Sequence, residues 1–111
     1  MAKKRSAKDR ERLRALIEEA TVDCYNEEEQ EIGLLTMIED NLACPFRAKV
    51  IGEEVEVVRL ESASEGLGVK AICKYKGKEY SIDVTSLEWG KDRPEGVEWI
   101  EAYLAWRSGG V

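Results

Sequence analysis

The sequence predicts a single α+β domain in which two helices precede a small antiparallel sheet and a last helix follows it. Apolar residues recur at helical spacing before residue 42, alternate at period two within residues 46–89, and return to helical spacing in residues 94–106. At 111 residues the chain can form one hydrophobic core. We therefore predict one domain over residues 1–111, with a flexible basic leader over residues 1–5 and a helical part over residues 6–42.

The first helix is predicted to begin near Ser6 or Ala7. Its apolar residues follow the i, i+3, i+4, i+7, i+11 spacing that lines one face of a helix, and they are Leu13, Leu16, Ile17, Ala20 and Cys24. Charged residues fall largely outside this stripe. The pattern indicates an amphipathic helix that rests on a core.

A second helix is predicted from Glu27 to Glu39 or Asp40. Asn26 precedes it, and Asn both tolerates left-handed backbone and caps a following helix. Glu29 stands three residues after Asn26, as a capping box requires. The expected apolar face consists of Ile32, Leu35, Met37, Ile38 and Leu42.

Four short strands are predicted over residues 48–51, 55–61, 67–75 and 79–84, where β-branched residues are frequent and apolar residues alternate. Turn-forming residues separate them. This spacing predicts a small SH3-like barrel or a strongly bent antiparallel sheet.

The last helix is predicted to begin with Pro94 at its first position and to end near Trp106. Val97, Ile100 and Leu104 form one stripe. The neighbouring aromatic residues are interpreted as parts of the core and its lid rather than as a ligand cage, and they are Trp99, Tyr103 and Trp106.

The formal net charge of −6 is distributed unevenly. Residues 1–14 contain seven basic and two acidic side chains, a balance of +5, so the other 10 basic and 21 acidic residues give the body −11. An acidic body repels phosphate backbones and attracts cations. This distribution argues against nucleic acid as a partner and in favour of a cation.

Composition also limits the chemistry. The chain has no histidine, and its three cysteines show no C-x-x-C spacing, which excludes a common zinc site and the usual histidine-dependent catalysis. We therefore predict that the protein is not an enzyme. No run of about 18 apolar residues suggests a membrane span, and no secretory segment is recognised, so a cytoplasmic location is expected.

The carboxylates of the second helix differ in how easily the helix itself explains them. Those in its first turn, such as Glu28 and Glu29, are favoured by the positive end of the helix dipole. Glu39 and Asp40 instead lie near the negative end, next to unpaired carbonyl oxygens close to Asn41. A bound hard cation would offset the negative end of the dipole and give the carbonyl oxygens a partner. The chain lacks the spacing of an EF-hand loop, so such a site would be assembled differently.

Residues 22–57 resemble the cyanobacterial-type calcium-binding protein family, a small family without EF-hands. The resemblance rests on Val22-Asp23-Cys24-Tyr25, Glu28-Glu29-Gln30, Gly33, Glu39-Asp40, Leu42, Pro45-Phe46, Ala48, Gly52-Glu53 and Val55-Glu56-Val57. It implies a calcium binder of α+β build. By position, it implies as acidic candidates Asp23, Glu28, Glu29, Glu39 and Asp40.

Glu29 and Asp40 are eleven residues apart, so on one helix they lie about 16 Å apart and cannot share an ion. We therefore expect two separate calcium-binding places. One would combine Glu39 or Asp40 with carbonyls near Asn41, and the other would combine Asp23 with a glutamate at the start of the second helix. The leading hypothesis is that the protein is a Ca²⁺ buffer or sensor. It includes an unidentified protein as a further partner. The alternative is an SH3-like adaptor that binds protein or nucleic acid.

Overall fold

The computed structural model describes residues 7–63, 68–90 and 93–109. The elements in order are α1 (Ala7–Ala20), α2 (Glu27–Asn41), β1 (Phe46–Val50), β2 (Glu53–Ser62), β3 (Val69–Tyr75), β4 (Lys78–Asp83), the 3₁₀ turn η1 (Val84–Ser86) and α3 (Val97–Arg107). The predicted α+β order is confirmed. The predicted leader over residues 1–5 lies outside the described residues.

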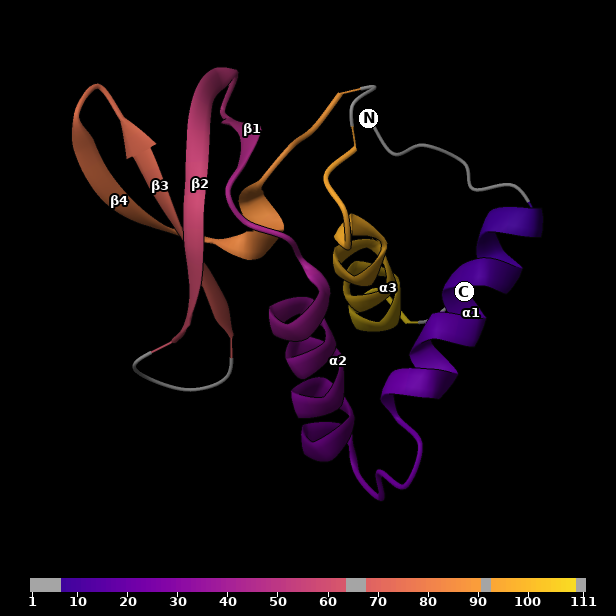
Figure 1. Cartoon of the computed structure of the whole chain (residues 1–111). Helices are drawn as coiled ribbons and strands as arrows, with labels where there is room; N and C mark the ends of the chain where they lie inside the picture. Colours follow the sequence, from indigo (N-terminus) through magenta and orange to yellow (C-terminus); the bar gives the residue numbers. More distant parts are fainter. Residues whose placement is uncertain (1–6, 64–67, 91–92, 110–111) are drawn as a thin grey trace.

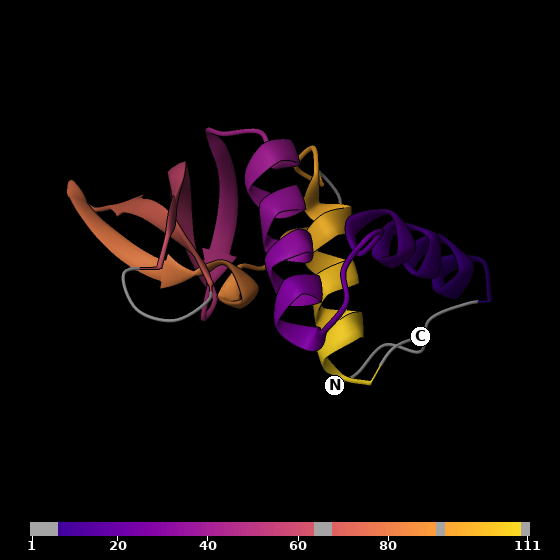
Figure 2. The ribbon, with the colours of Figure 1, turned by 90° about the horizontal axis from the view of Figure 1, so that it is seen from below.

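The sheet and the helices occupy separate halves of the molecule (Figure 1). Seen from below, α2 lies nearest the sheet, and α3 lies between α2 and α1 (Figure 2). The last helix in the sequence therefore packs between the first two. The two ends of α2 consequently meet different surroundings, one close to the sheet and the other at the turn from α1.

The four strands form an antiparallel meander in the order β1-β2-β3-β4. Between β2 and β3 the register shifts between Val57 and Arg59, which marks a bulge. Lys49 of β1 also forms an isolated bridge with Glu88. Within the described residues β1 and β4 are not paired, so the sheet is open and bent. Of the two predicted forms, the SH3-like barrel is not formed.

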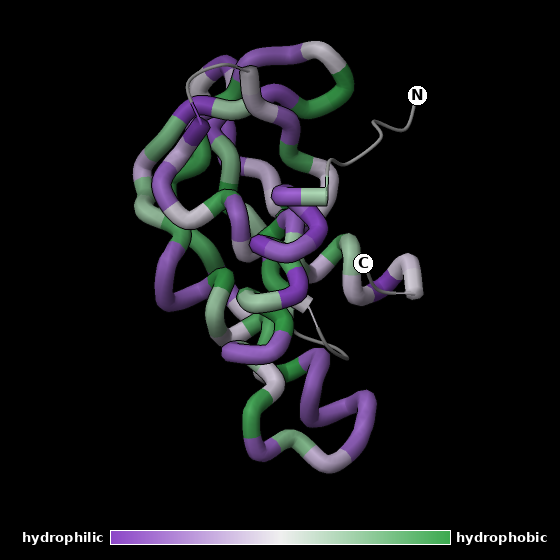
Figure 3. Tube along the Cα trace, turned by 90° about the vertical axis from the view of Figure 1, so that its right-hand side faces the viewer, coloured by the Kyte–Doolittle hydropathy of each residue, from purple (hydrophilic) through white to green (hydrophobic). Residues whose placement is uncertain are grey.

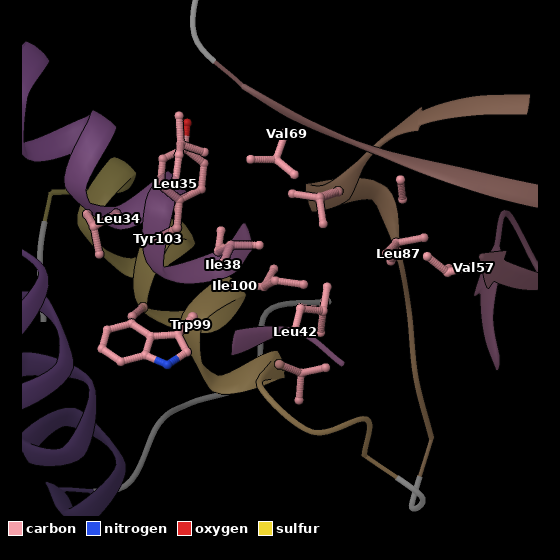
Figure 4. Packing of buried hydrophobic residues seen from close by; sticks show 14 of the residues in the cluster. Leu34, Leu35, Ile38, Leu42, Val57, Val69, Leu87, Trp99, Ile100 and Tyr103 are labelled. Carbon is pink, nitrogen blue, oxygen red and sulfur yellow. The ribbon is translucent and has the colours of Figure 1, made fainter. Parts of the chain in front are cut away.

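The core lies where α2 and α3 meet the inner face of the sheet (Figure 4). Leu34 and Ile38 of α2 are buried, as are Ile100 of α3 and Val57 of β2. The expected alternating residues of β2 and β3 are buried where they are described, namely Val55, Val57, Val69, Ala71 and Cys73, but Ile72 is buried as well and interrupts the alternation in β3. The predicted strand start at Leu67 lies outside the described residues.

The connection between α1 and α2 differs from the prediction. The helix α1 ends at Ala20, so Cys24 does not continue its stripe. The hydroxyl of Thr21 donates to the carbonyl of Ile17 at 2.7 Å, and Asp23 adopts left-handed backbone with φ 64°. The left-handed residue is therefore Asp23 rather than Asn26. Asn26 has extended backbone and caps α2 as predicted.

The buried face of α2 is rotated relative to the prediction. Leu34 is buried although it was not expected to be, whereas Ile32 remains 45% exposed. Gly33 faces α1, and a Cβ atom there would collide with the carbonyl oxygen of Ala20. The absence of a side chain at Gly33 lets the two helices approach, which sets this rotation.

The helix α3 begins at Val97, and the prediction of Pro94 as its first residue is wrong. The N–H of Val97 donates to the carbonyl of Pro94 at 3.3 Å, which closes a turn before the helix. Gly96 precedes α3 with φ 93°, a left-handed conformation that ends this turn. As expected, Trp99 and Tyr103 are buried in the core.

Candidate metal centre

The six predicted ligand residues fall into two groups at opposite ends of α2. We call Glu39, Asp40 and Asn41 the C-terminal group and Asp23, Glu28 and Glu29 the N-terminal group. The helix is continuous over Glu27–Asn41, so about 16 Å of helix separates positions eleven residues apart. The structure does not bring the two groups together.

Asp40 is the least constrained carboxylate of the C-terminal group. It is exposed and makes no hydrogen bond or ion pair with any described residue. It lies in the last turn of α2, where no basic residue offsets the negative end of the dipole. Its oxygens are therefore available to a cation.

Glu39 joins the helix end to the sheet. Its carboxylate accepts a hydrogen bond of 3.0 Å from the hydroxyl of Ser62, the last residue of β2. This contact brings a third type of oxygen donor, a hydroxyl, next to the C-terminal group. Both side chains are exposed, so solvent reaches the pair.

Asn41 is the last residue of α2, and its side-chain amide binds back to the helix. The Nδ2 group donates to the carbonyl of Met37 at 2.8 Å, and the N–H of Leu42 donates to the carbonyl of Ile38 at 3.0 Å. Among the described residues no hydrogen bond uses the backbone carbonyls of residues 39–41. These carbonyls are hard oxygen donors of the kind that calcium accepts.

The segment before α3 fixes the position of this helix end. The N–H of Ala43 donates to the carbonyl of Glu95 at 3.0 Å. A Cβ atom on Gly96 would collide with the backbone of Asn41 and Leu42. The C-terminal group is thus held where α2, the end of β2 and the start of α3 meet.

The N-terminal group has a structural role of its own. Asn26 Oδ1 accepts the N–H of Glu29 at 2.8 Å, and Glu29 Oε1 accepts the N–H of Tyr25 at 2.7 Å. This is the predicted reciprocal cap, except that Glu29 binds the residue before the N-cap. Asp23 and Glu28 are exposed. Figure 3 shows the hydrophilic residues of this turn at the lower end of the molecule.

Neither group is a closed ligand cage. Within the described residues no three histidine, cysteine, aspartate or glutamate side chains converge closely enough to hold a metal ion. A calcium ion takes six to eight oxygens, so a site at either end of α2 would need backbone carbonyls and water as well as carboxylates. The C-terminal group offers such carbonyls, and among the described residues none of its carboxylates forms an ion pair with a cationic side chain.

Glu31, next to the N-terminal group, links α2 to α3. The hydroxyl of Tyr103 donates to Glu31 Oε2 at 2.6 Å, and Trp106 Nε1 donates to Gln30 Oε1 at 3.1 Å. The two rings are stacked with centroids 6.2 Å apart. Burial, followed by the hydrogen bond to Glu31 and the charge of that residue, raises the pKa of Tyr103 to about 12.

This raised pKa predicts a loss of stability in alkali. The folded protein prefers neutral Tyr103, so the contribution is complete below pH 10, the ordinary tyrosine pKa, and is lost as the pH rises towards about 12. Tyr103→Phe should cost about 1.5–3 kcal/mol at pH 8, because the hydrogen bond to a charged group is lost. Urea unfolding of both proteins from pH 8 to 12 should show the advantage of the parent shrinking, and a constant difference would contradict the role of this hydroxyl.

Two contacts could not be found from the sequence. The bond between Ser62 and Glu39 depends on where β2 ends relative to α2, and no local pattern encodes that position. The bond between Tyr103 and Glu31 joins residues 72 positions apart. The sequence did contain a weak signal for the second, since a buried tyrosine usually finds a hydrogen-bond partner.

A bent sheet, three helices and an exposed oxygen-rich helix end define an α+β protein suited to bind a hard cation. A family described as calcium binding, the CcbP family, matches residues 14–107, and the chain belongs to this family. The chain is similar to the crystal structure of Anabaena CcbP, with 21% identity, a TM-score of 0.70 and coverage of 96% of this chain and 94% of that one.

A second solved structure is a calcium-binding protein in its calcium-binding form. It is 21% identical, with a TM-score of 0.66 and coverage of 94% of this chain and 96% of the other. At this identity both structures establish the fold. A comparison with curated proteins finds no significant match. No helix in the described ranges is long and apolar enough to cross a membrane.

Proposed function

We propose that this protein is a Ca²⁺ buffer or sensor that binds the ion at the C-terminal end of α2. Membership of the calcium-binding family supports Ca²⁺ as the ion that is bound. Asp40 supports the C-terminal end of α2 as the binding place. It is an exposed carboxylate without a protein partner among the described residues, and it lies on the last turn of a 15-residue helix. A cation there would offset the negative end of the dipole.

Each member of the C-terminal group would have a different part. Asp40 would supply the principal carboxylate, and Glu39 would supply a second one that its bond to Ser62 holds beside the sheet. Asn41 would contribute its side-chain Oδ1, because its Nδ2 group donates to the carbonyl of Met37 and its own backbone carbonyl faces Gly96. Bound calcium would supply positive charge that neutralises these oxygens.

The N-terminal group is the second candidate place, through Asp23 and Glu28. Glu29 is less available, since one of its oxygens caps α2. A cytoplasmic role in binding rather than catalysis agrees with three free thiols and a chain without histidine. As a sensor, the protein would act on a further protein.

A calcium titration of two matched variants tests this assignment. Asp40→Asn should weaken binding tenfold or more, about 1.4 kcal/mol per tenfold. Without metal, the same change should stabilise the fold by about 0.3–1 kcal/mol, because it removes a charge from the unfavourable end of the dipole.

The matched control is Asp23→Asn, which makes the same chemical change in the N-terminal group. Asn tolerates the left-handed backbone that Asp23 adopts, so the fold should be kept. Asp23→Asn should leave the calcium affinity at the C-terminal end of α2 unchanged. If it loses affinity while Asp40→Asn does not, the principal site is the turn between α1 and α2.

A further inference from the structure

The sheet carries an apolar hollow of about 500 Å³ on its inner face, beyond the part that the helices cover. All four strands line it, with side chains that include Val50, Val55, Tyr75 and Ile82. Val55 also belongs to the hydrophobic core. In the described part of the chain the lining contains no helical residue, so the hollow is a part of the core face that the described helices leave uncovered.

Ile51 also lines this hollow, and its conformation is unusual. It occupies the two-residue turn between β1 and β2 with φ 50°, followed by Gly52 with φ 77°. Such turns favour Asn or Asp before Gly, and a β-branched residue at positive φ is strained. Ile51 is nevertheless 92% exposed. Neither local backbone preference nor burial within one chain explains an isoleucine here.

The charges around the hollow are complementary to one another. Glu53 lines it from β2. Lys78 is paired with Tyr75 across β3 and β4, and directly opposed residues share a face, so Lys78 lies on the same face two strands away from Glu53. Neither charge has a partner among the described residues. A surface with one acid and one base on its two sides can match a copy of itself.

We propose that this hollow is the face through which two copies of the chain associate about a two-fold axis. Each copy places its Ile51 in the hollow of the other, and Glu53 of each copy meets Lys78 of the other. A two-fold interface uses the same patch on both subunits, so one acid and one base per copy form two ion pairs. The dimer does not depend on the calcium site at the end of α2.

The mass in solution tests the proposal directly. Sedimentation equilibrium at 0.15 M salt, with protein from about 1 μM to about 1 mM, should show the mass rising from 12.6 kDa towards twice that value. A monomer at every concentration would overturn it. A dimer that survives Ile51→Asn unchanged would overturn it as well.

Ile51→Asn separates association from folding. Asn before Gly suits this turn better than isoleucine, so at about 1 μM, where both proteins should be monomeric, the variant should melt at the same temperature or higher. Its dimer should nevertheless dissociate at least tenfold more readily, because an apolar anchor is lost from the hollow. A loss of association without a loss of stability cannot arise from misfolding.

Charge reversal identifies the partner as a second copy. Glu53→Lys and Lys78→Glu should each be monomeric, while an equimolar mixture should form a heterodimer in which both contacts again join opposite charges. A mixture that stays monomeric would overturn the two-fold arrangement. The control is Glu54→Lys, the neighbouring residue paired with Lys49 on the opposite face, which should leave the dimer intact.

Long-range repulsion cannot mimic the result for Glu53→Lys. Each chain has a net charge of −6, and replacing one acid by one base changes it to −4, since −6 + 2 = −4. Glu53→Lys and Glu54→Lys therefore weaken the repulsion between copies equally. Only contacts at the hollow predict dissociation for the first variant and not for the second.

Discussion

Calcium at a hundredfold excess over its dissociation constant should stabilise the fold by about 2.7 kcal/mol, because an ion that binds the native state alone adds RT ln(1 + [L]/Kd). For a domain of this size the melting temperature should rise by roughly 10 °C. Thermal unfolding followed by circular dichroism, with calcium and then with an excess of chelator, measures the shift. In Asp40→Asn the shift at the same calcium concentration should fall to about half or less, because a tenfold weaker site then contributes only about 1.4 kcal/mol.

Magnesium provides the control for this experiment. It requires octahedral coordination at about 2.0–2.1 Å, whereas a helix end with carbonyls and water suits the larger and more variable shell of calcium. Equal concentrations of the two ions should therefore give a clearly smaller shift with magnesium. Equal shifts would indicate general screening of an acidic surface, and an unchanged melting curve at millimolar calcium would contradict calcium binding by the native state.

Gly96→Ala should be among the most damaging single substitutions, with a loss of about 3 kcal/mol or more in the free energy of unfolding. Gly96 has φ 93°, and its new Cβ atom would collide with the backbone of Asn41 and Leu42, which cannot move aside as a flexible side chain could. Because this contact positions the end of α2, the variant should also bind calcium more weakly.

Gly77→Ala is the matched control, since Gly77 has φ 80° but no atom within 4 Å of its added Cβ. It should lose only the cost of left-handed backbone, about 1–2 kcal/mol. Urea unfolding of the two variants thus separates backbone strain from close contact. Equal losses would show that the contact between Gly96 and the end of α2 contributes little.

The glutamates in the first half of α2 illustrate why the sequence alone does not show whether a carboxylate binds a metal or stabilises the fold. Glu29 was a candidate ligand, yet its carboxylate caps α2 through the N–H of Tyr25. Glu31 was not selected, although it binds Tyr103 and so couples α2 to α3. Spacing along the chain places both residues correctly on α2 but does not reveal which atoms already have partners.

Local signals along the chain specify the order of helices and strands, the capped start of α2 and the separation of the six candidate ligands into two places. These features depend on local periodicity, capping and a fixed rise per residue, which neighbours in the chain specify. The resemblance to a calcium-binding family, confirmed by the match over residues 14–107, also needed only the sequence.

Which side chains remain free depends on contacts between segments that are distant in the chain. The hydrogen bond from Ser62 to Glu39, the contact of Gly96 with the end of α2 and the open hollow beside Ile51 all join segments that are distant in the chain or lie on different strands. Such contacts depend on strand register and on helix rotation, and a single residue of slip would change every partner. Local patterns therefore predicted the elements, whereas long-range packing decided which of their surfaces are available for binding.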